Sequence, residues 1–167
     1  MAGLFNARAG VARLLSAAWF RIRGPLQWRV LWLAHAKFII GVCGVVVNER
    51  GEVLLLRHRF WKAGSWGLPS GYAERGETLE GALERELLEE VGLRADKVSV
   101  FRMVSGYKFR LEANLLAYVS GDSRMSLDGM EVIEARFFAL EDLPEGLLAD
   151  HREVIRLALF GGFYTAS

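Results

Sequence analysis

Cysteine is nearly absent from this chain, because Cys43 is the only one among 167 residues. One thiol cannot build a disulfide framework, so a small secreted protein held together by disulfides is excluded, and a reducing cytoplasm is the expected compartment. Cys43 lies in the apolar run FIIGVCGVVV, and we interpret it as a core residue rather than a nucleophile. The three histidines, His35, His58 and His151, are far apart in the sequence and show no metal-ligand spacing.

Two familiar nucleotide-binding loops are also missing. The sequence contains neither GxxxxGK followed by Ser or Thr nor GxGxxG, so the P-loop and the dinucleotide-binding interpretations have no local support. The length suits one domain with a sizeable core, and 52% of the residues are hydrophobic.

Acidic residues are absent from the N-terminal stretch, because the first one in the chain is Glu49. Residues 1–48 contain six basic side chains, those of Arg8, Arg13, Arg21, Arg23, Arg29 and Lys37. The stretch therefore carries a net charge of +6, and because the whole chain carries +1, the remainder carries −5. This asymmetry separates a basic extension at residues 1–36 from a domain at residues 37–167.

The extension is expected to be helical over residues 4–36, with a break near Gly24 and Pro25. Its apolar runs are too short, and too often interrupted by arginine, to span a bilayer or to form a secretory signal. It could pack on the rest of the chain or on a second subunit of a homodimer. Its basic, tryptophan-rich composition also suits the surface of an anionic membrane. A nucleic acid is not expected as a partner, because the arginines alternate with bulky aliphatic residues.

The richest pattern in the chain is GYAERGETLEGALERELLEEVGL at residues 71–93. We predict a helix over residues 79–91, because Leu, Ala, Glu and Arg dominate there. Thr78 is a suitable N-terminal cap, and Gly92 is a suitable C-terminal stop. The segment before the helix contains Gly71 and Gly76 and is expected to be a loop.

The predicted helix places carboxylates on its apolar face. Leu79, Ala82, Leu83 and Leu87 form a stripe at helical spacing. Glu86 and Glu90 fall inside this stripe, and Glu89 falls at its edge. Carboxylates at this spacing repel one another, and burial beside leucines adds a desolvation cost. A divalent cation would offset both costs, and Mg²⁺ or Mn²⁺ suits oxygen ligands. The competing interpretation is an ordinary solvated acidic helix.

The spacing of the whole segment resembles the signature box of the Nudix hydrolases and matches it at every defined position. A looser likeness to the Nudix domain extends over residues 38–160. The resemblance implies an α/β/α sandwich with a mixed sheet, preceded here by the helical extension. It also implies an enzyme that cleaves phosphoric anhydride bonds.

The resemblance further implies a role for each residue of the box. Four groups would bind the metal ion, Mg²⁺ or Mn²⁺: the carboxylates of Glu86, Glu89 and Glu90 and the backbone carbonyl of Gly71. Arg85 would pair with Glu77 and hold the loop against the helix. The general base would be one of the helix glutamates or a carboxylate of the later stretch GMEVIEARFFAL, which offers Glu131 and Glu134. Ser70 stands where the family often has glycine, which affects the loop shape rather than the metal ligands.

Nudix enzymes are similar in hydrolysing a nucleoside diphosphate linked to another group, by attack of water on phosphorus. ADP-ribose or a nucleotide sugar is the first expectation here, a nucleoside triphosphate is the second, and a non-catalytic nucleotide-binding module is the third. Candidates for phosphate contact are Arg57, Arg59 and Lys62, and candidates for stacking on a base are Trp66, Tyr107 and Phe109. The competing interpretation is a solvated turn for the basic residues and core or loop packing for the aromatic ones.

The remaining elements follow from apolar runs and turn residues. A continuous apolar run predicts a buried strand at residues 38–47, and a turn at residues 48–51 leads to a second strand at 53–58. We predict a loop at 61–69, an antiparallel pair at 98–105 and 109–120, a strand at 135–140 and a last helical region from 141 to about 160.

Overall fold

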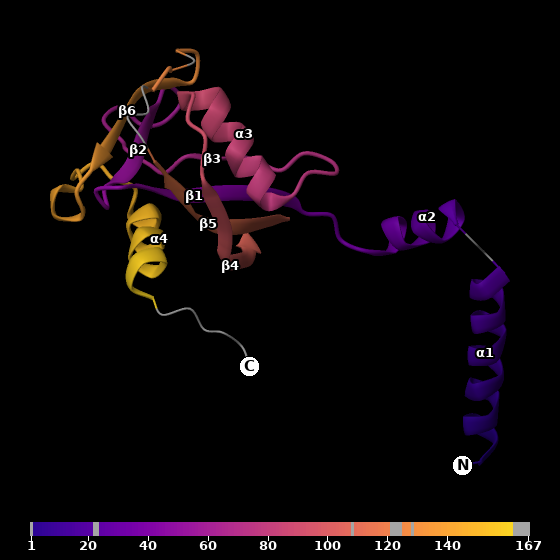
Figure 1. Ribbon diagram of the computed structural model, residues 1–167. Coiled ribbons are helices and arrows are strands. Elements are labelled where there is room, and N and C mark those ends of the chain that lie inside the picture. Colours follow the sequence, from indigo (N-terminus) through magenta and orange to yellow (C-terminus); the bar gives the residue numbers. More distant parts are fainter. Residues whose placement is uncertain (1, 22–23, 108, 121–124, 128, 162–167) are drawn as a thin grey trace. The chain divides into compact units, whose positions relative to one another are not determined.

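The computed structural model describes residues 2–21, 24–107, 109–120, 125–127 and 129–161, without the side chains of residues 2–9 and 106–107 (Figure 1). The chain divides into two compact units, Met1–Lys37 and Phe38–Ser167.

The N-terminal unit contains two helices, α1 (Ala2–Arg21) and α2 (Pro25–Ala34). Proline fits the first turn of α2 because the backbone N–H that it lacks would have no partner there. Gly24, which precedes it, has a φ of 70°. The predicted helical extension with a break at Gly24 and Pro25 is therefore confirmed. Among the helices of the described residues, none combines the length and the apolar character that crossing a membrane requires.

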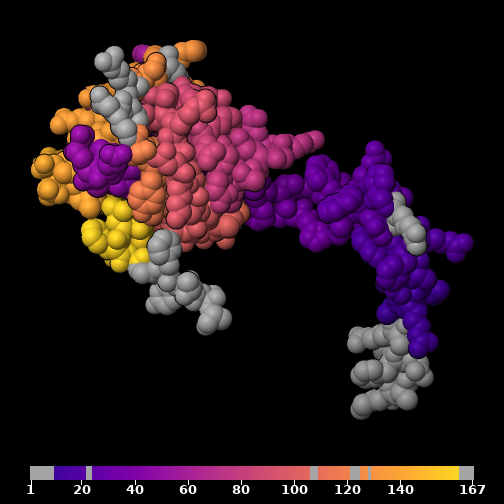
Figure 2. Space-filling model, viewed as in Figure 1, coloured from indigo at the N-terminus to yellow at the C-terminus, as the bar shows by residue number. Residues whose placement is uncertain are grey.

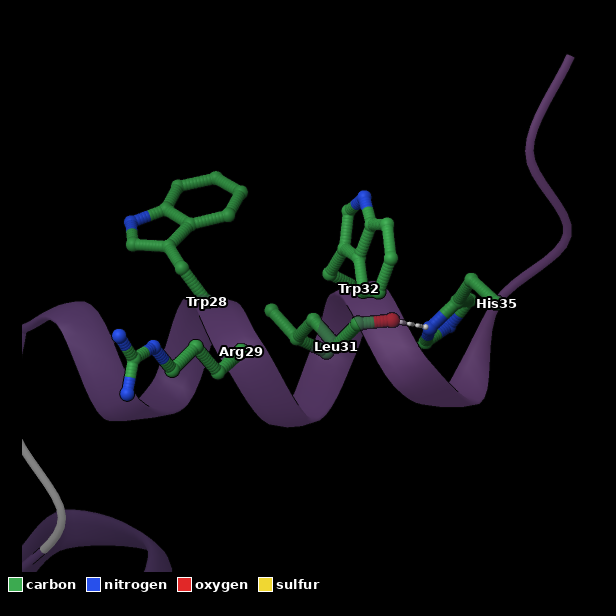
Figure 3. Close-up of a pocket in the computed structure, with 5 residues that line it drawn as sticks. All are labelled: Trp28, Arg29, Leu31, Trp32 and His35. Atoms are coloured by element: carbon green, nitrogen blue, oxygen red, sulfur yellow. Dashed lines mark hydrogen bonds between the residues drawn. The ribbon is translucent and has the colours of Figure 1, made fainter.

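Large apolar side chains of this unit are exposed, and α2 has no buried residue. They are Val11, Leu14, Leu15, Trp19, Phe20, Leu26, Trp28, Val30, Trp32 and Leu33. Trp28 and Trp32 project from the same side of α2 (Figure 3). They border a shallow hollow with Arg29, Leu31 and His35. The ammonium group of Lys37 lies 4.4 Å from the centre of the Trp32 ring.

The second unit is built on one six-stranded sheet. Its strands are β1 (Ile39–Asn48), β2 (Val53–His58), β3 (Ser70–Tyr72), β4 (Lys97–Tyr107), β5 (Arg110–Val119) and β6 (Val132–Phe138). The order is β4-β5-β1-β2-β6, and β3 pairs with β1. β1 and β5 are parallel, whereas the other pairs are antiparallel, so the sheet is mixed as predicted. β1 is buried at every position from Gly41 to Val47, as expected of a central strand covered on both faces.

Helices cover both faces of this sheet (Figure 1). α3 (Leu79–Val91) packs on one face with Val42, Val46 and Leu54. α4 (Ala149–Phe160) packs on the other with Cys43, Val45 and Leu55. Alternate residues of β1 thus serve opposite cores, and the predicted α/β/α sandwich is confirmed. Cys43 is a core residue, as predicted, and its burial raises the pKa of its thiol to about 12.

Several boundaries differ from the prediction. β3 was not predicted, because three residues after Pro69 are too few to show strand periodicity. β6 begins at Val132 rather than at residue 135, because Val132 is buried and pairs with His58. The last helical region is a short 3-10 helix at Leu140–Asp142 followed by a loop, and α4 starts only at Ala149. Pro144 in that loop cannot supply the backbone N–H that a continuous helix needs.

Candidate active site

The helix α3 begins and ends as its sequence predicts. The hydroxyl of Thr78 accepts a hydrogen bond from the backbone N–H of Gly81 at 3.0 Å. Gly92 adopts the left-handed conformation, with a φ of 70°, and its N–H donates to the last carbonyls of the helix. The caps fix the two ends of the helix, so that Glu86, Glu89 and Glu90 all lie within it.

Arg85 joins the loop to this helix. Its Nε donates to Glu77 Oε1 at 3.1 Å, and its Nη2 donates to the carbonyl of Tyr72 at 2.9 Å. Its Nη1 donates to Glu86 at 3.0 Å and to Glu89 at 3.3 Å. The hydrogen bonds from Arg85 hold the pKa of Glu77 below its ordinary value, and the backbone N–H of Glu74 adds to this effect. Figure 2 shows this loop and helix in pink on the surface of the domain.

The three helix glutamates differ in exposure. Glu90 is buried, the side chain of Glu86 is 16% exposed, and that of Glu89 is 61% exposed. Glu90 Oε1 lies 3.0 Å from Nε2 of His58, which β2 supplies. Glu86 lies against the backbone of Gly71, where a Cβ atom would collide with the Glu86 carboxylate. Only glycine at position 71 allows the loop to approach the helix this closely.

These groups fit a hard divalent cation by their chemistry. Glu86, Glu89 and Glu90 supply carboxylate oxygens, Glu86 lies against the Gly71 backbone, and oxygen is the ligand atom that Mg²⁺ and Mn²⁺ prefer. Burial of Glu90, with Glu86 partly buried one turn earlier, has a desolvation cost that positive charge offsets. Among the described residues, however, no three His, Cys, Asp or Glu side chains converge as metal ligands. Glu86 and Glu89 are directed to Arg85 instead, and Glu90 to His58.

A cavity of about 330 Å³ lies beside Gly71, and most of its lining was not predicted as part of the site. Its polar and aromatic lining includes His58, Trp61, Tyr72, Arg110 and His151. Trp61 lies between the two histidines, with ring centres 4.7 Å from His58 and 6.2 Å from His151. His58 and His151 are far apart in the sequence, so no local pattern predicts this cluster. The fold brings the two side chains together.

His151 lies in the first turn of α4, and its tautomer follows from its contacts. The backbone N–H of Leu68 donates to Nδ1 of His151 at 2.8 Å. Burial lowers the pKa of His151, against the opposing charges of Glu112 and Asp150. A neutral ring that accepts at Nδ1 carries its proton on Nε2. His151 is therefore available as a hydrogen-bond donor at the cavity.

The predicted phosphate-binding and stacking residues have other contacts. Arg57 donates to Glu134 at 2.7 Å and lies over the ring of Trp66. Trp66 packs edge-on against Phe138. Arg59 donates to the carbonyls at positions 129 and 130. Arg57, Arg59 and Trp66 are not among the described residues that line the cavity beside Gly71.

The remaining candidates lie around the strand ends. Glu131 is an exposed residue just before β6, and its carbonyl accepts from the N–H of Arg59 at 2.8 Å. Glu134 lies on β6 and is paired with Arg57. Lys62 lies in the loop after β2, and Phe109 is exposed just before β5. The side chain of Tyr107 lies outside the described part of the chain.

The fold and the acidic helix define a class of α/β/α proteins with a carboxylate-rich site beside a glycine loop. A family model described as "NUDIX domain" matches residues 37–158. The chain belongs to the Nudix family.

Known proteins resemble a large part of the chain. The NAD-capped RNA hydrolase NudC of Escherichia coli O9:H4 (strain HS) is 33% identical over 111 residues, which are 63% of this chain and 41% of that protein. The match thus spans about two fifths of the length of that relative. The NUDIX domain of Shewanella oneidensis NrtR, solved with ADP ribose, shares the fold at a TM-score of 0.63 and 20% identity, over 85% of this chain and 95% of that one. MutT of Methanosarcina mazei Go1 has a TM-score of 0.57 and 25% identity, over 73% and 93% of the two chains.

Proposed function

We propose that this protein hydrolyses a nucleoside diphosphate linked to another group, with ADP-ribose or a nucleotide sugar as the first substrates to test. The observation that carries the proposal is the close approach of Gly71 to Glu86, held by the Arg85–Glu77 pair next to the buried Glu90. A helix that served only structure would gain nothing from burying carboxylates in this way. The family membership supports the same reaction class.

The chain supplies the ligands for a divalent cation. Glu86, Glu89, Glu90 and the Gly71 carbonyl would hold Mg²⁺ or Mn²⁺. When bound, such an ion neutralises phosphate charge and lowers the pKa of water. Arg85 keeps Glu86 and the loop in position, and His58 fixes the orientation of Glu90.

The reaction forms one bond and breaks another. The oxygen of water bonds to one phosphorus, and the anhydride P–O bond on that phosphorus breaks, so two phosphate esters are released. A carboxylate accepts the proton of water, and the candidates are a helix glutamate and Glu131. No covalent intermediate with the protein is required. His151 and Arg110 lie at the adjacent cavity, where they can donate to phosphate oxygens.

A substrate panel tests the proposal directly. Purified protein is incubated with Mg²⁺ or Mn²⁺ and ADP-ribose, nucleotide sugars, NADH and nucleoside triphosphates, and the products are separated. Cleavage of the linked diphosphates supports the proposal, whereas preferred cleavage of the triphosphates favours the second expectation. If nothing in the panel is cleaved, the interpretation as a nucleotide-binding module gains.

We also propose that residues 1–36 form an attachment extension to the domain at 37–167, and that the protein works in the cytoplasm at a membrane surface. The acid-free, basic sequence and the exposed tryptophans of α2 favour an anionic membrane as the partner. Packing on the domain at 37–167 or on a second subunit is the alternative, and sizing of the intact protein without lipid tests the second of these. A stable dimer in which α2 is protected would contradict the membrane proposal.

A further inference from the structure

A row of polar residues lies on the face of the sheet that α4 covers. Arg110, Glu112 and Asn114 alternate along β5 and therefore point to the same face. Leu116, the next residue of the row, belongs to the core beneath α4. Asn114 is only 1% exposed, so the row carries polar groups into the interior.

Two polar atoms of this row have no hydrogen-bond partner among the described residues. They are Oδ1 of Asn114, an acceptor, and Nε of Arg110, a donor. The other groups of the row bond to one another: Arg110 Nη2 donates to Glu112 at 2.9 Å, and Asn114 Nδ2 donates to Glu112 at 3.2 Å. Buried polar atoms are nearly always satisfied, so an acceptor and a donor left without partners in one row indicate a ligand with the opposite groups.

Arg110, Glu112 and Asn114 line a cavity of about 350 Å³. Its lining includes Arg102, Val104, Asp150 and Val154 as well as the polar row. Arg110 also lines the cavity beside Gly71, so the two cavities meet at this side chain. Gly41 makes room for it, because a Cβ atom there would lie 3.0 Å from Nη2 of Arg110.

The strand register gives the distance between the cavity beside Gly71 and Asn114. Ser70 pairs with Cys43, and Cys43 pairs with Asn114. Two strand spacings amount to about 10 Å. A nucleotide with its phosphates in the cavity beside Gly71 can extend its base toward Asn114 through the two cavities that meet at Arg110. The path crosses β3, β1 and β5, which lie next to one another in the sheet (Figure 1).

We propose that Asn114, Arg110 and Glu112 form the subsite for the nucleobase of the substrate, an inference that rests on the proposed hydrolase function. Asn114 Oδ1 accepts an N–H of the base, and Arg110 Nε donates to a ring nitrogen or a carbonyl oxygen of the nucleotide. Nucleobases carry donors and acceptors of both kinds on their edges. Glu112 is a positioning residue, because it holds the side chains of both partners. Val104 and Val154 supply apolar walls for the rings.

Calorimetric binding without added metal tests this subsite in the intact chain. The probes are AMP, GMP, CMP and UMP, with ribose 5-phosphate as the ligand that lacks a base. The wild-type protein is expected to bind at least one nucleotide more tightly than ribose 5-phosphate. Asn114→Leu should weaken that nucleotide by roughly tenfold and leave ribose 5-phosphate unchanged. Tyr118→Phe, on the same strand outside both cavities, is the control for strand integrity.

Glu112→Gln provides a second variant in case the buried Asn114 position does not tolerate leucine. Its side chain is 33% exposed, so the fold should persist, and it should reduce nucleotide binding in the same selective way. Equal loss for the nucleotide and for ribose 5-phosphate would overturn the proposal, as would a wild-type protein that does not distinguish them. Selective loss in a protein that hydrolyses nothing would sink the hydrolase function but not the subsite. Hydrolysis by the protein, together with an unchanged base preference in both variants, would support the hydrolase function and overturn the subsite.

Discussion

The helices α2 and α3 have opposite relations to solvent. In α3, Glu90 is a carboxylate that is only 6% exposed, whereas in α2 Trp28 is a large apolar residue that is 73% exposed. Each case departs from the usual distribution of residue types between core and surface. The contacts of α3 account for its departure within the domain, through His58, Arg85 and Gly71. Among the described residues of the N-terminal unit, no contact accounts for the exposed tryptophans of α2, and the proposed membrane contact is the explanation that we test.

Removing a buried carboxylate charge should have the largest effect. Glu90→Gln is expected to lower kcat by roughly 10³-fold, because several kcal/mol of transition-state stabilisation depend on the metal site. The measurement is turnover of the best substrate of the panel, with circular dichroism as the check on folding. Glu84→Gln, on the exposed side of the same helix, should retain wild-type activity. An active Glu90→Gln protein would contradict the metal assignment.

The next largest effect should come from adding a methyl group at a glycine, and it should differ between the loop beside α3 and the N-terminal helix α1. Gly71→Ala drives a Cβ atom into the Glu86 carboxylate, and overpacking of this kind costs about 1–3 kcal/mol in the free energy of unfolding. Activity should fall as well, because the loop must withdraw from the helix. Gly10→Ala in α1 meets nothing within 4 Å and should be neutral or slightly stabilising. Urea denaturation of both variants measures the difference, and equal effects would argue against a tight loop–helix contact.

The α3 region shows what local sequence can predict. The caps at Thr78 and Gly92 and the burial of Glu90 follow from propensity and helical spacing, and the structure confirms them. The cavity residues His58 and His151 could not be predicted, because β2 and α4 meet only through the sheet. The parallel pairing of β1 with β5 brings Asn114 beside Cys43, and no local pattern encodes a pairing between strands so far apart. The contacts of Arg57 and Trp66 depend on β6 in the same way.

Polar substitutions on α2 should separate the membrane role from the catalytic one. The double variant Trp28→Ser and Trp32→Ser is expected to weaken binding to anionic vesicles by roughly tenfold, because two exposed apolar rings are lost. Hydrolysis of a soluble substrate should stay unchanged. Co-sedimentation with phosphatidylserine-containing vesicles, with phosphatidylcholine vesicles as the control, measures the effect. Binding that survives the double variant would remove α2 from the proposed interface.

The smallest expected effect is a pH dependence of stability that arises from His151. Burial lowers the pKa of His151 below its ordinary value of 6.5, so the unfolded chain binds this proton at a higher pH than the folded domain does. As pH falls below about 6.5, the unfolded state binds more protons and the free energy of unfolding decreases; above that pH the ring is neutral in both states and contributes nothing. Urea denaturation at pH 7.5 and 5.5 should show a smaller decrease for His151→Asn than for the wild type. His35→Asn on the exposed α2 should keep the wild-type decrease, and if His151→Asn keeps it too, burial of His151 is not its cause.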